Sequence, residues 1–566
     1  LDRFEVTVFG AEPDSAYDRV HLSEVFGGKA PEALRMADPA WYEESGIALR
    51  LGAEVEVLDR AARTLTLANG EQFPYDRLVL ATGSVPFVPP IPGHQREGCF
   101  VYRTLGDLAA IRDACAQARS GVVIGGGLLG LEAANALRLL GLKTQVVEFA
   151  PRLMPVQLDE SGGAVLRDKI QALGVEVLVE KATECIEQGE QARHRLRFKD
   201  GSHLETDVLL FSAGIRPADA LARQSGLNVG ERGGICIDDG CHSSDPAILA
   251  IGECALWQGR IFGLVAPGYQ MARTAVASLC GGETRFVGAD MSTKLKLMGV
   301  DVGSIGDAHA STAGAQELVL LDRVNGIYKK LVTDGEGNRL LGAILVGDGA
   351  DYERLLQYYQ NGVALPQPPL SLLVGEAGAA PAPLVLPDSA ILCSCHNVSK
   401  GDVVAAVRAG NHELSAVKSC TKAGTGCGGC SNLLKQVVDQ TLADLGVEAD
   451  KGLCEHFAYG RQELYHLARV GELKSFEALR DKHGQGLGCD ICRPTVASIL
   501  ASLWNEHVLE KPHRALQDTN DAFLANLQKD GTYSVVPRIP GGEITPEGLI
   551  TIGEVARKYG LYTEIT

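Results

Sequence analysis

Two pairs of closely spaced cysteines have the residue types and spacing to hold an iron–sulfur cluster. Cys393 and Cys395 form a C-x-C pair, and Cys427 and Cys430 form a C-x-x-C pair. A [2Fe–2S] cluster takes two thiolates on each iron, and two tight pairs supply them. Glycines around the second pair would let the loop wrap around the cluster. The pattern therefore predicts a carrier of single electrons.

A glycine-rich loop upstream has the spacing G-x-G-x-x-G, with Gly125, Gly127 and Gly130 at the fixed positions. It follows the apolar strand 122–124 and opens a helix, so it would offer a dinucleotide pyrophosphate a helix N-terminus. Glu148 ends the next strand, where an acid accepts hydrogen bonds from the ribose hydroxyls and repels a 2′-phosphate. The loop therefore predicts NADH rather than NADPH as the bound nucleotide, against the alternative of a merely structural glycine turn.

The cysteine pattern recurs 61 or 62 residues further along the chain, which predicts two small helical domains in tandem. The repeated positions are Cys454, His456, Cys489 and Cys492. Imidazole ligates iron in some clusters, so His456 is compatible with a second [2Fe–2S] centre. Alternatively, the repeat has kept its fold and lost its cluster. The sequence leaves both readings open.

Length, charge and cysteine usage limit the classes of protein to consider. A chain of 566 residues with 45% hydrophobic residues predicts several globular domains. The formal net charge of −18 argues against nucleic acid as a partner, and no stretch is long and apolar enough to predict a membrane span. The first residues do not resemble a secretory signal, so we expect a cytoplasmic protein whose fifteen cysteines are metal ligands or buried thiols.

Several cysteines lie outside both sets. Cys236 and Cys241 form a C-x4-C pair on a late strand and turn, which favours a structural role over a redox-active disulfide. Cys420 is expected to be an ordinary buried thiol. The remaining cysteines have no partner spacing and are expected to pack in cores: Cys99, Cys115, Cys185, Cys254 and Cys280.

The elements that must position these residues alternate between short strands and helices. The strand 5–9 is followed by Glu12, as in the second strand of a dinucleotide fold, whose first strand and glycine loop would then lie upstream of residue 1. We expect the chain to be truncated at both ends. Residues 290–370 have the mixed pattern of an additional α+β domain, and a proline- and glycine-rich linker follows.

These motifs together resemble a known family. Five segments resemble the FAD- and NAD-binding motifs of pyridine-nucleotide flavin reductases. They are Tyr17–Ser23, Ala81–Gly83, the Gly125 loop, Ala213–Pro217 and Ile251–Ala255. The tandem cysteine repeat is similar to bacterioferritin-associated ferredoxin domains. Residues 515–566 resemble the start of a sulfite/nitrite reductase ferredoxin-like half-domain. In this order, across the whole chain, the segments resemble the large subunit of NAD(P)H-dependent, ammonia-forming nitrite reductase.

The resemblance implies a multidomain α/β fold: a flavoprotein reductase with two dinucleotide-binding domains and an α+β interface domain, then tandem small helical [2Fe–2S] domains and the beginning of the half-domain. The implied division is FAD-binding 1–110, NAD-binding 111–230, FAD-binding 231–288, interface 289–372, linker 373–388, [2Fe–2S] domain 389–445, second such domain 450–510, and half-domain 515–566.

The resemblance also assigns roles to residues at the flavin. Glu12 would bind the FAD adenosine ribose, and Tyr17 and Arg19 would lie near the flavin. The other implied FAD-site residues are Thr82, Gly83, Gly214, Gly252 and Glu253. Hydride transfer to flavin needs positioning more than an acid or base, so we assign no catalytic side chain.

In the family, electrons continue from the [2Fe–2S] cluster to sirohaem and [4Fe–4S], which reduce nitrite to ammonium. The cysteines of that centre are absent from this chain, so we expect the electron-input part of the enzyme, with a Rieske-like small subunit as an open question. Sulfite as terminal substrate stays open too. The alternatives are a stand-alone NADH-dependent FAD/iron–sulfur reductase serving a ferredoxin-like acceptor, and a non-enzymatic iron-handling module.

Overall fold

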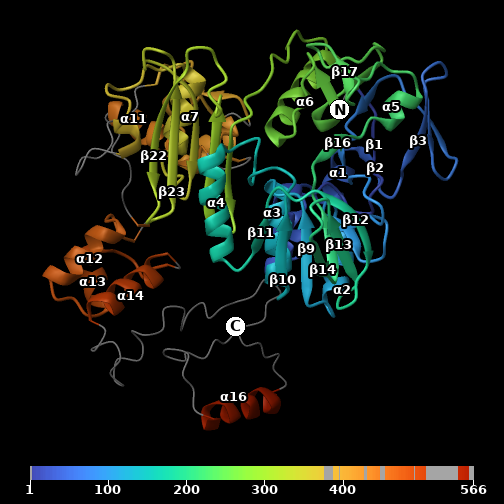
Figure 1. Cartoon of the computed structure of the whole chain (residues 1–566). Coiled ribbons are helices and arrows are strands. Elements are labelled where there is room, and N and C mark those ends of the chain that lie inside the picture. The colour runs from blue at the N-terminus through green and yellow to red at the C-terminus, as the bar shows by residue number, and fades with distance from the viewer. Residues whose placement is uncertain are drawn as a thin grey trace. The chain divides into compact units, whose positions relative to one another are not determined.

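The computed structural model describes residues 3–374, 386–393, 396–425, 430–445, 453–454, 456–489, 491–504 and 546–559 (Figure 1). The chain forms two compact units, Leu1–Leu442 and Ala443–Thr566. Among the helices in these ranges, none combines the length and apolarity needed to cross a lipid bilayer.

A five-stranded parallel sheet carries the glycine loop. Its strand order is β11-β10-β9-β15-β8, and its central strands are buried along their length because both faces are covered. Helix α3 packs on one face, and the antiparallel sheet of β12, β13 and β14 packs on the other. The bounds are β8 Cys99–Val101, α2 Leu105–Cys115, β9 Ser120–Ile124, α3 Leu128–Leu139, β10 Lys143–Val147, α4 Glu160–Ala172, β11 Glu176–Leu178, β12 Thr183–Gln188, β13 His194–Phe198, β14 His203–Thr206 and β15 Val208–Phe211.

Small sheets from both ends of the first 290 residues form the second part of this unit. Parallel pairing of β6 with β18 joins segments 170 residues apart, so the chain leaves this part and returns to it. The bounds are β1 Val6–Phe9, η1 Arg19–Gly27, η2 Pro31–Leu34, α1 Pro39–Glu44, β2 Ile47–Arg50, β3 Val55–Asp59, β4 Thr64–Leu67, β5 Gln72–Pro74, β6 Leu78–Leu80, β7 Ser84–Pro86, β16 Ile215–Pro217, α5 Ala220–Gln224, β17 Ile235–Ile237, β18 Ile248–Ala250, η3 Gly252–Cys254, β19 Ala255–Trp257 and α6 Val265–Leu279.

The predicted α+β region is an antiparallel sheet of order β20-β21-β24-β23-β22. Successive residues of a strand point to opposite faces, so Leu345 packs under α7 while Ile344 packs toward α4 (Figure 1). Helix α4 belongs to the parallel-sheet part, so this packing joins the two regions. The bounds are β20 Thr293–Leu297, β21 Val300–Gly306, β22 Gln316–Asp322, β23 Ile327–Thr333, β24 Leu340–Val346, α7 Tyr352–Asn361 and α8 Ser371–Val374.

The two cysteine regions have the same order of helices, as the repeat predicts. Each has two helices between its cysteine pairs and a third that begins at or just after the last cysteine. A capping box formed by Ser399 and Asp402 begins α9. The bounds are β25 Ile391–Cys393, β26 Val398–Ser399, α9 Lys400–Arg408, α10 Leu414–Thr421 and α11 Ser431–Asp444, then α12 Arg461–Val470, α13 Phe476–His483 and α14 Cys492–Leu503.

Within the expected half-domain at 515–566, the structure describes helix α16, Pro546–Tyr559. The rest of that range lies outside the described residues. The expectation that Cys420 is buried is wrong, because Cys420 is exposed near the end of α10, where its thiol donates to the Val417 carbonyl at 3.4 Å. Cys280, at the end of α6, is exposed as well.

The structural role of the C-x4-C pair stays a prediction. Cys241 is buried and Cys236 partly buried, and burial raises the pKa of the Cys241 thiol to about 12. A thiol with such a pKa is a poor nucleophile at neutral pH, which agrees with a structural role.

Candidate cofactor and metal sites

The glycine loop has the close contacts that only glycine permits. A Cβ on Gly125 would lie 2.1 Å from the Ser212 carbonyl oxygen, and one on Gly130 would lie 1.9 Å from the Gly125 carbonyl oxygen. Gly127 differs, since no atom lies within 4 Å of where its Cβ would be. Gly127 is also the N-cap of α3 and has no side-chain cap, so the loop presents an open helix N-terminus.

Glu148 lies beside this loop, as predicted. Its carboxylate accepts hydrogen bonds from the backbone N–H groups of Gly126 at 2.5 Å and Ala150 at 2.6 Å. These two bonds fix the carboxylate next to the open end of α3. The remaining lone pairs of its oxygens are available to hydroxyl donors such as a ribose diol.

Glu132, two residues past Gly130, was missed by the sequence analysis. It lies on α3 where this helix packs on η1, and burial raises its pKa to about 7, opposed by nearby His21. An acid within the apolar stretch of a buried helix is the signal that could have drawn attention to it. Helix η1 begins within the Tyr17–Ser23 motif, so α3 packs against part of a segment that the resemblance assigns to cofactor binding.

Glu12, Tyr17 and Arg19 are brought together as a group. The Tyr17 hydroxyl donates to Glu12 Oε2 at 2.6 Å, and Arg19 forms an ion pair with Glu12 Oε1. Burial and the Glu12 hydrogen bond raise the pKa of Tyr17, so it remains a neutral donor. The guanidinium of Arg19 also lies over the Tyr17 ring, 4.7 Å from its centroid.

A second polar group surrounds Glu253 and contains two residues that the sequence did not indicate. Arg103 and Ser84 donate to Glu253 Oε2 at 2.7 and 2.6 Å. The backbone carbonyl of Arg103 accepts a hydrogen bond from Arg19 at 2.9 Å. Arg103 therefore connects the carboxylates of Glu12 and Glu253, although neither has a fixed spacing to it.

The glycines predicted to line the flavin site lie in loops that follow strands and have open faces. No atom lies within 4 Å of the Cβ position at Gly83, Gly214 or Gly252. Thr82 holds this region in shape, because its hydroxyl donates to the Ala218 carbonyl at 2.6 Å and the Ala218 N–H donates to Gly83. An extended ligand could therefore approach the backbone closely here, which fits the dinucleotide part of FAD.

In the first cysteine domain, Cys393 lies on β25 and Cys430 precedes α11, and both are buried. Cys395 and Cys427 lie outside the described residues. Four thiolates in two pairs match the donor set of a [2Fe–2S] cluster.

Strand β25 is fixed to the α+β region by two amide side chains of α7. Asn361 Oδ1 accepts from the Ile391 N–H at 3.0 Å, and Gln357 Nε2 donates to the Ile391 carbonyl at 3.3 Å. Asn361 Nδ2 donates to Gln357 Oε1 at 2.9 Å, so the pair is itself connected. These amides satisfy both backbone groups of Ile391, two residues before Cys393.

An aromatic contact joins the same domain to α6. The His396 ring lies near-parallel to Tyr269, with centroids 6.5 Å apart, and its Nε2 lies 3.2 Å from the Thr425 hydroxyl. Tyr269 follows Gly268, whose Cβ position lies 3.6 Å from the Gly252 Cα. One chain of contacts thus connects the Gly252 loop with the residue after Cys395.

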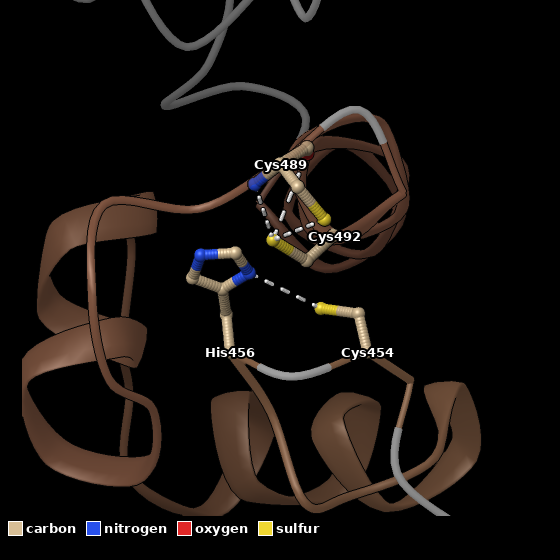
Figure 2. Close-up of side chains that lie close together, drawn as sticks. All are labelled: Cys454, His456, Cys489 and Cys492. Carbon is tan, nitrogen blue, oxygen red and sulfur yellow. Dashed lines mark hydrogen bonds between the residues drawn. The ribbon is translucent and has the colours of Figure 1, made fainter.

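The second cysteine set forms a compact group of four donors, shown in Figure 2. Cys454 Sγ lies 3.7 Å from His456 Nδ1, and Cys489 Sγ lies 3.8 Å from Cys492 Sγ. The first pair precedes α12 and the second pair begins α14. Although burial opposes it, hydrogen bonds from the backbone N–H groups of Cys492 and Ile491 lower the pKa of Cys489 to about 7.

Fold and sites together define a class: a pyridine-nucleotide-linked flavoprotein oxidoreductase with an attached iron–sulfur domain. The family models that match agree with each part. They are the pyridine nucleotide-disulphide oxidoreductase over residues 2–278, the rubredoxin NAD⁺ reductase C-terminal domain over 292–363, the BFD-like [2Fe-2S] binding domain over 391–440, and the nitrite/sulfite reductase ferredoxin-like half domain over 526–566.

Similar proteins give the family. The chain is 57% identical over its whole length to a nitrite reductase [NAD(P)H] large subunit of Klebsiella oxytoca and 53% identical to a nitrite reductase (NADH) large subunit of Escherichia coli, covering 59% and 67% of them. A solved NAD-dependent persulfide reductase from A. fulgidus is similar at 26% identity and a TM-score of 0.58, over 63% of this chain and 72% of that one. The chain belongs to the family of nitrite reductase [NAD(P)H] large subunits, and it spans about three fifths to two thirds of the length of these relatives.

Proposed function

We propose that this chain is the electron-input part of an NADH-dependent nitrite reductase that forms ammonium. The observation that carries the proposal is the combination, in one chain of this family, of an NAD- and FAD-dependent reductase, a [2Fe–2S] domain and the beginning of a nitrite/sulfite reductase half-domain. A reductase for a separate ferredoxin-like acceptor has no use for the last of these parts.

The open N-terminus of α3 would bind the pyrophosphate of NADH, with Gly125 and Gly130 permitting the close packing and Gly127 the approach. Glu148 would accept hydrogen bonds from the adenosine ribose hydroxyls. A phosphate on the 2′ position would face this carboxylate, which favours NADH over NADPH.

FAD fits the region between Glu12 and Glu253, because the open glycine faces lie there with two carboxylates held in place by Tyr17, Arg19 and Arg103. Glu12 would bind the adenosine ribose, and Thr82, Gly83, Gly214, Gly252 and Glu253 would line the rest of the site. When bound, FAD supplies the conversion of a two-electron donor into single electrons.

Cys393, Cys395, Cys427 and Cys430 would hold the [2Fe–2S] cluster, which accepts single electrons. The contact between Tyr269 and His396 marks where we propose that electrons leave the flavoprotein part. Gln357 and Asn361 act as positioning residues, since they fix the strand of Cys393 to α7.

An anaerobic absorbance titration of the full-length protein tests the proposal. Addition of NADH should bleach the flavin and cluster absorbance, and nitrite should restore it with formation of ammonium. Bleaching without recovery on nitrite would contradict nitrite reduction and indicate a reductase for another acceptor. Absence of bleaching by NADH would favour the iron-handling module, and recovery on sulfite alone would make sulfite the terminal substrate.

Three finer points belong to the same proposal. Sirohaem and [4Fe–4S] would complete the enzyme in its full-length form, and a small Rieske-like subunit is a candidate partner. A reducing compartment such as the cytoplasm, which keeps cluster ligands as thiols or thiolates, is part of the same proposal. The domain division given above, with boundaries near 110, 230, 288, 372, 388, 445 and 510, remains a prediction.

A further inference from the structure

The donor atoms of the second cysteine set are too close together for a two-iron cluster. All four lie within 4.8 Å of one another. In a [2Fe–2S] cluster each iron takes one pair, so the donors of one pair lie more than about 5 Å from those of the other. The separation between the pairs, rather than that within each pair, therefore distinguishes the two kinds of centre.

The same spacing matches a single tetrahedral ion. Zinc–sulfur bonds of about 2.3 Å and zinc–nitrogen bonds of about 2.0 Å place neighbouring donors about 3.4–3.8 Å apart. The Cys454–His456 and Cys489–Cys492 distances are 3.7 and 3.8 Å.

The surroundings of His456 hold its ring with Nδ1 toward the cysteines, as Figure 2 shows. Its carbonyl accepts from the Gln485 N–H at 2.9 Å, and the Gly486 Cβ position lies 2.8 Å from ring atom Cδ2. The loop before Cys489 therefore closes against the opposite edge of the imidazole. A side chain at Gly486, where φ is +66°, would collide with the ring.

We propose that the second domain binds one Zn²⁺ through the thiolates of Cys454, Cys489 and Cys492 and Nδ1 of His456. Three cysteines and one histidine are a usual donor set of structural zinc, and zinc has no redox chemistry. The ion stabilises the domain and carries no electrons. The inference does not depend on nitrite as substrate.

A structural ion also suits the size of this domain. Its core is a single cluster around Phe457 and Leu479, within a segment of about fifty residues, a size at which a metal commonly supplements the core. Cys454, Cys489 and Cys492 pack against this core. Binding therefore joins the loop before α12 to the first turn of α14.

Metal analysis of the purified full-length protein as it exists tests the proposal. Because sirohaem and [4Fe–4S] add iron, the analysis is made on the 566-residue chain as well. In the 566-residue chain we expect about one zinc and about two irons, the irons belonging to the first set. About four irons per chain, with two distinct [2Fe–2S] signals in electron paramagnetic resonance after reduction, would overturn it. So would two irons with no zinc after growth in zinc-supplemented medium.

Variants assign the ion to its ligands. Cys492→Ser and His456→Ala should reduce bound zinc at least tenfold and leave iron unchanged, whereas His456→Cys, which restores a soft ligand, should retain zinc. Cys420→Ser, an exposed thiol outside both sets, should change neither metal. Loss of iron in Cys492→Ser together with retained iron in Cys420→Ser would contradict the assignment. If Cys492→Ser is insoluble, the unsubstituted chain is loaded with Co²⁺ instead. Absorption bands typical of tetrahedral cobalt–thiolate coordination would support the site. Their absence would count against it.

Discussion

At the scale of single residues, the candidate cofactor sites share carboxylates that hydrogen bonds hold in place. Glu12 is held by Tyr17 and Arg19, and Glu253 is held by Ser84 and Arg103. A carboxylate fixed by charge-assisted hydrogen bonds keeps its position before a ligand arrives, so less ordering entropy is lost on binding. Glu148 differs, because backbone N–H groups alone hold it.

The substitution Glu148→Gln tests the role of this carboxylate in nucleotide choice. Gln can still bond a ribose hydroxyl, but the negative charge that repels a 2′-phosphate is gone. We expect the KM for NADH to rise about tenfold, since hydrogen bonds to charged groups contribute about 1.5–3 kcal/mol, and the preference over NADPH to shrink. Stopped-flow reduction of the flavin by each nucleotide measures both. Glu54→Gln, which changes an exposed carboxylate outside the glycine loop, is the control. If the ratio of flavin reduction rates with NADH and NADPH is unchanged in Glu148→Gln, the assignment is refuted.

Glu132 predicts a pH-dependent stability. Its pKa is raised to about 7 in the folded chain, so folding favours the protonated acid, and this stabilisation is lost as pH rises toward and through the folded pKa. Glu132→Gln removes the penalty on the charged form. We expect its advantage in stability over the unsubstituted chain to grow by roughly 1 kcal/mol between pH 6 and pH 8.5. Thermal unfolding at the two pH values measures it, and an advantage that does not depend on pH would show that Glu132 is not the titrating group.

At the scale of elements, α7 connects the α+β region with the first cysteine domain. Asn361→Leu removes the acceptor for the Ile391 N–H and the donor to Gln357, so β25 loses one of its two amide hydrogen bonds to α7 and the other is less well held. We expect flavin reduction by NADH to keep its rate and cluster reduction to slow by about tenfold or more, because misplacement of reacting groups by about 1 Å has large kinetic costs. Rapid-mixing spectroscopy separates the two phases.

Asn325→Leu, on an exposed turn of the same region, is the matched control for this substitution. Equal slowing of both phases in Asn361→Leu would indicate general destabilisation rather than loss of positioning. An unchanged cluster phase would mean that β25 is held by other contacts.

The packing of α4 on the antiparallel sheet includes a buried cation. Lys330 is 3% exposed and contacts Asp159, the N-cap of α4, at 3.0 Å and Glu317 at 2.6 Å. Lys330→Met leaves Asp159 with only its hydrogen bonds from Tyr328 and Gly162, which we expect to cost about 2 kcal/mol. A lowered thermal midpoint checks this. Adding Asp159→Asn, which keeps the cap, should recover part of the loss, and strictly additive effects of the two changes would argue against coupling.

Elements with a local signal were predictable from the sequence, and contacts between distant elements were not. The Gly125 loop, the capping box at Ser399 and the order of helices in the repeat depend on neighbouring residues, and the structure has them all. Arg103 and Asn361 belong to no sequence motif, because their partners Glu253 and Ile391 lie 150 and 30 residues away in the chain. Cys420 was wrongly expected to be buried, since a short helix does not show from its sequence alone which side packs.

The boundary between regions shows the same limit. Strand β8, Cys99–Val101, joins the parallel sheet of the glycine loop, although the predicted division places it in the FAD-binding part. Its three residues have no periodicity of their own, and only pairing with β15 determines which sheet they join.

In the molecule as a whole, contacts link the proposed cofactor sites in the order that electrons would follow, and this predicts where the route can be interrupted. The Gly125 loop is joined to the Gly252 region through Arg103 and η1, and that region to the first cysteine domain through Tyr269 and His396.

Replacing Cys427 and Cys430 with Ser should therefore abolish nitrite reduction while NADH still reduces the flavin and ferricyanide still reoxidises it. Each iron takes two thiolates, so loss of this pair would leave one iron without a protein thiolate, and the cluster is not retained. Cys420→Ser, which changes an exposed thiol of the same domain, should keep both activities. Nitrite reduction that survives in the double variant would mean that electrons bypass the first set. Metal analysis of the same variant tests the second set separately, because we expect it to hold zinc and no [2Fe–2S] iron.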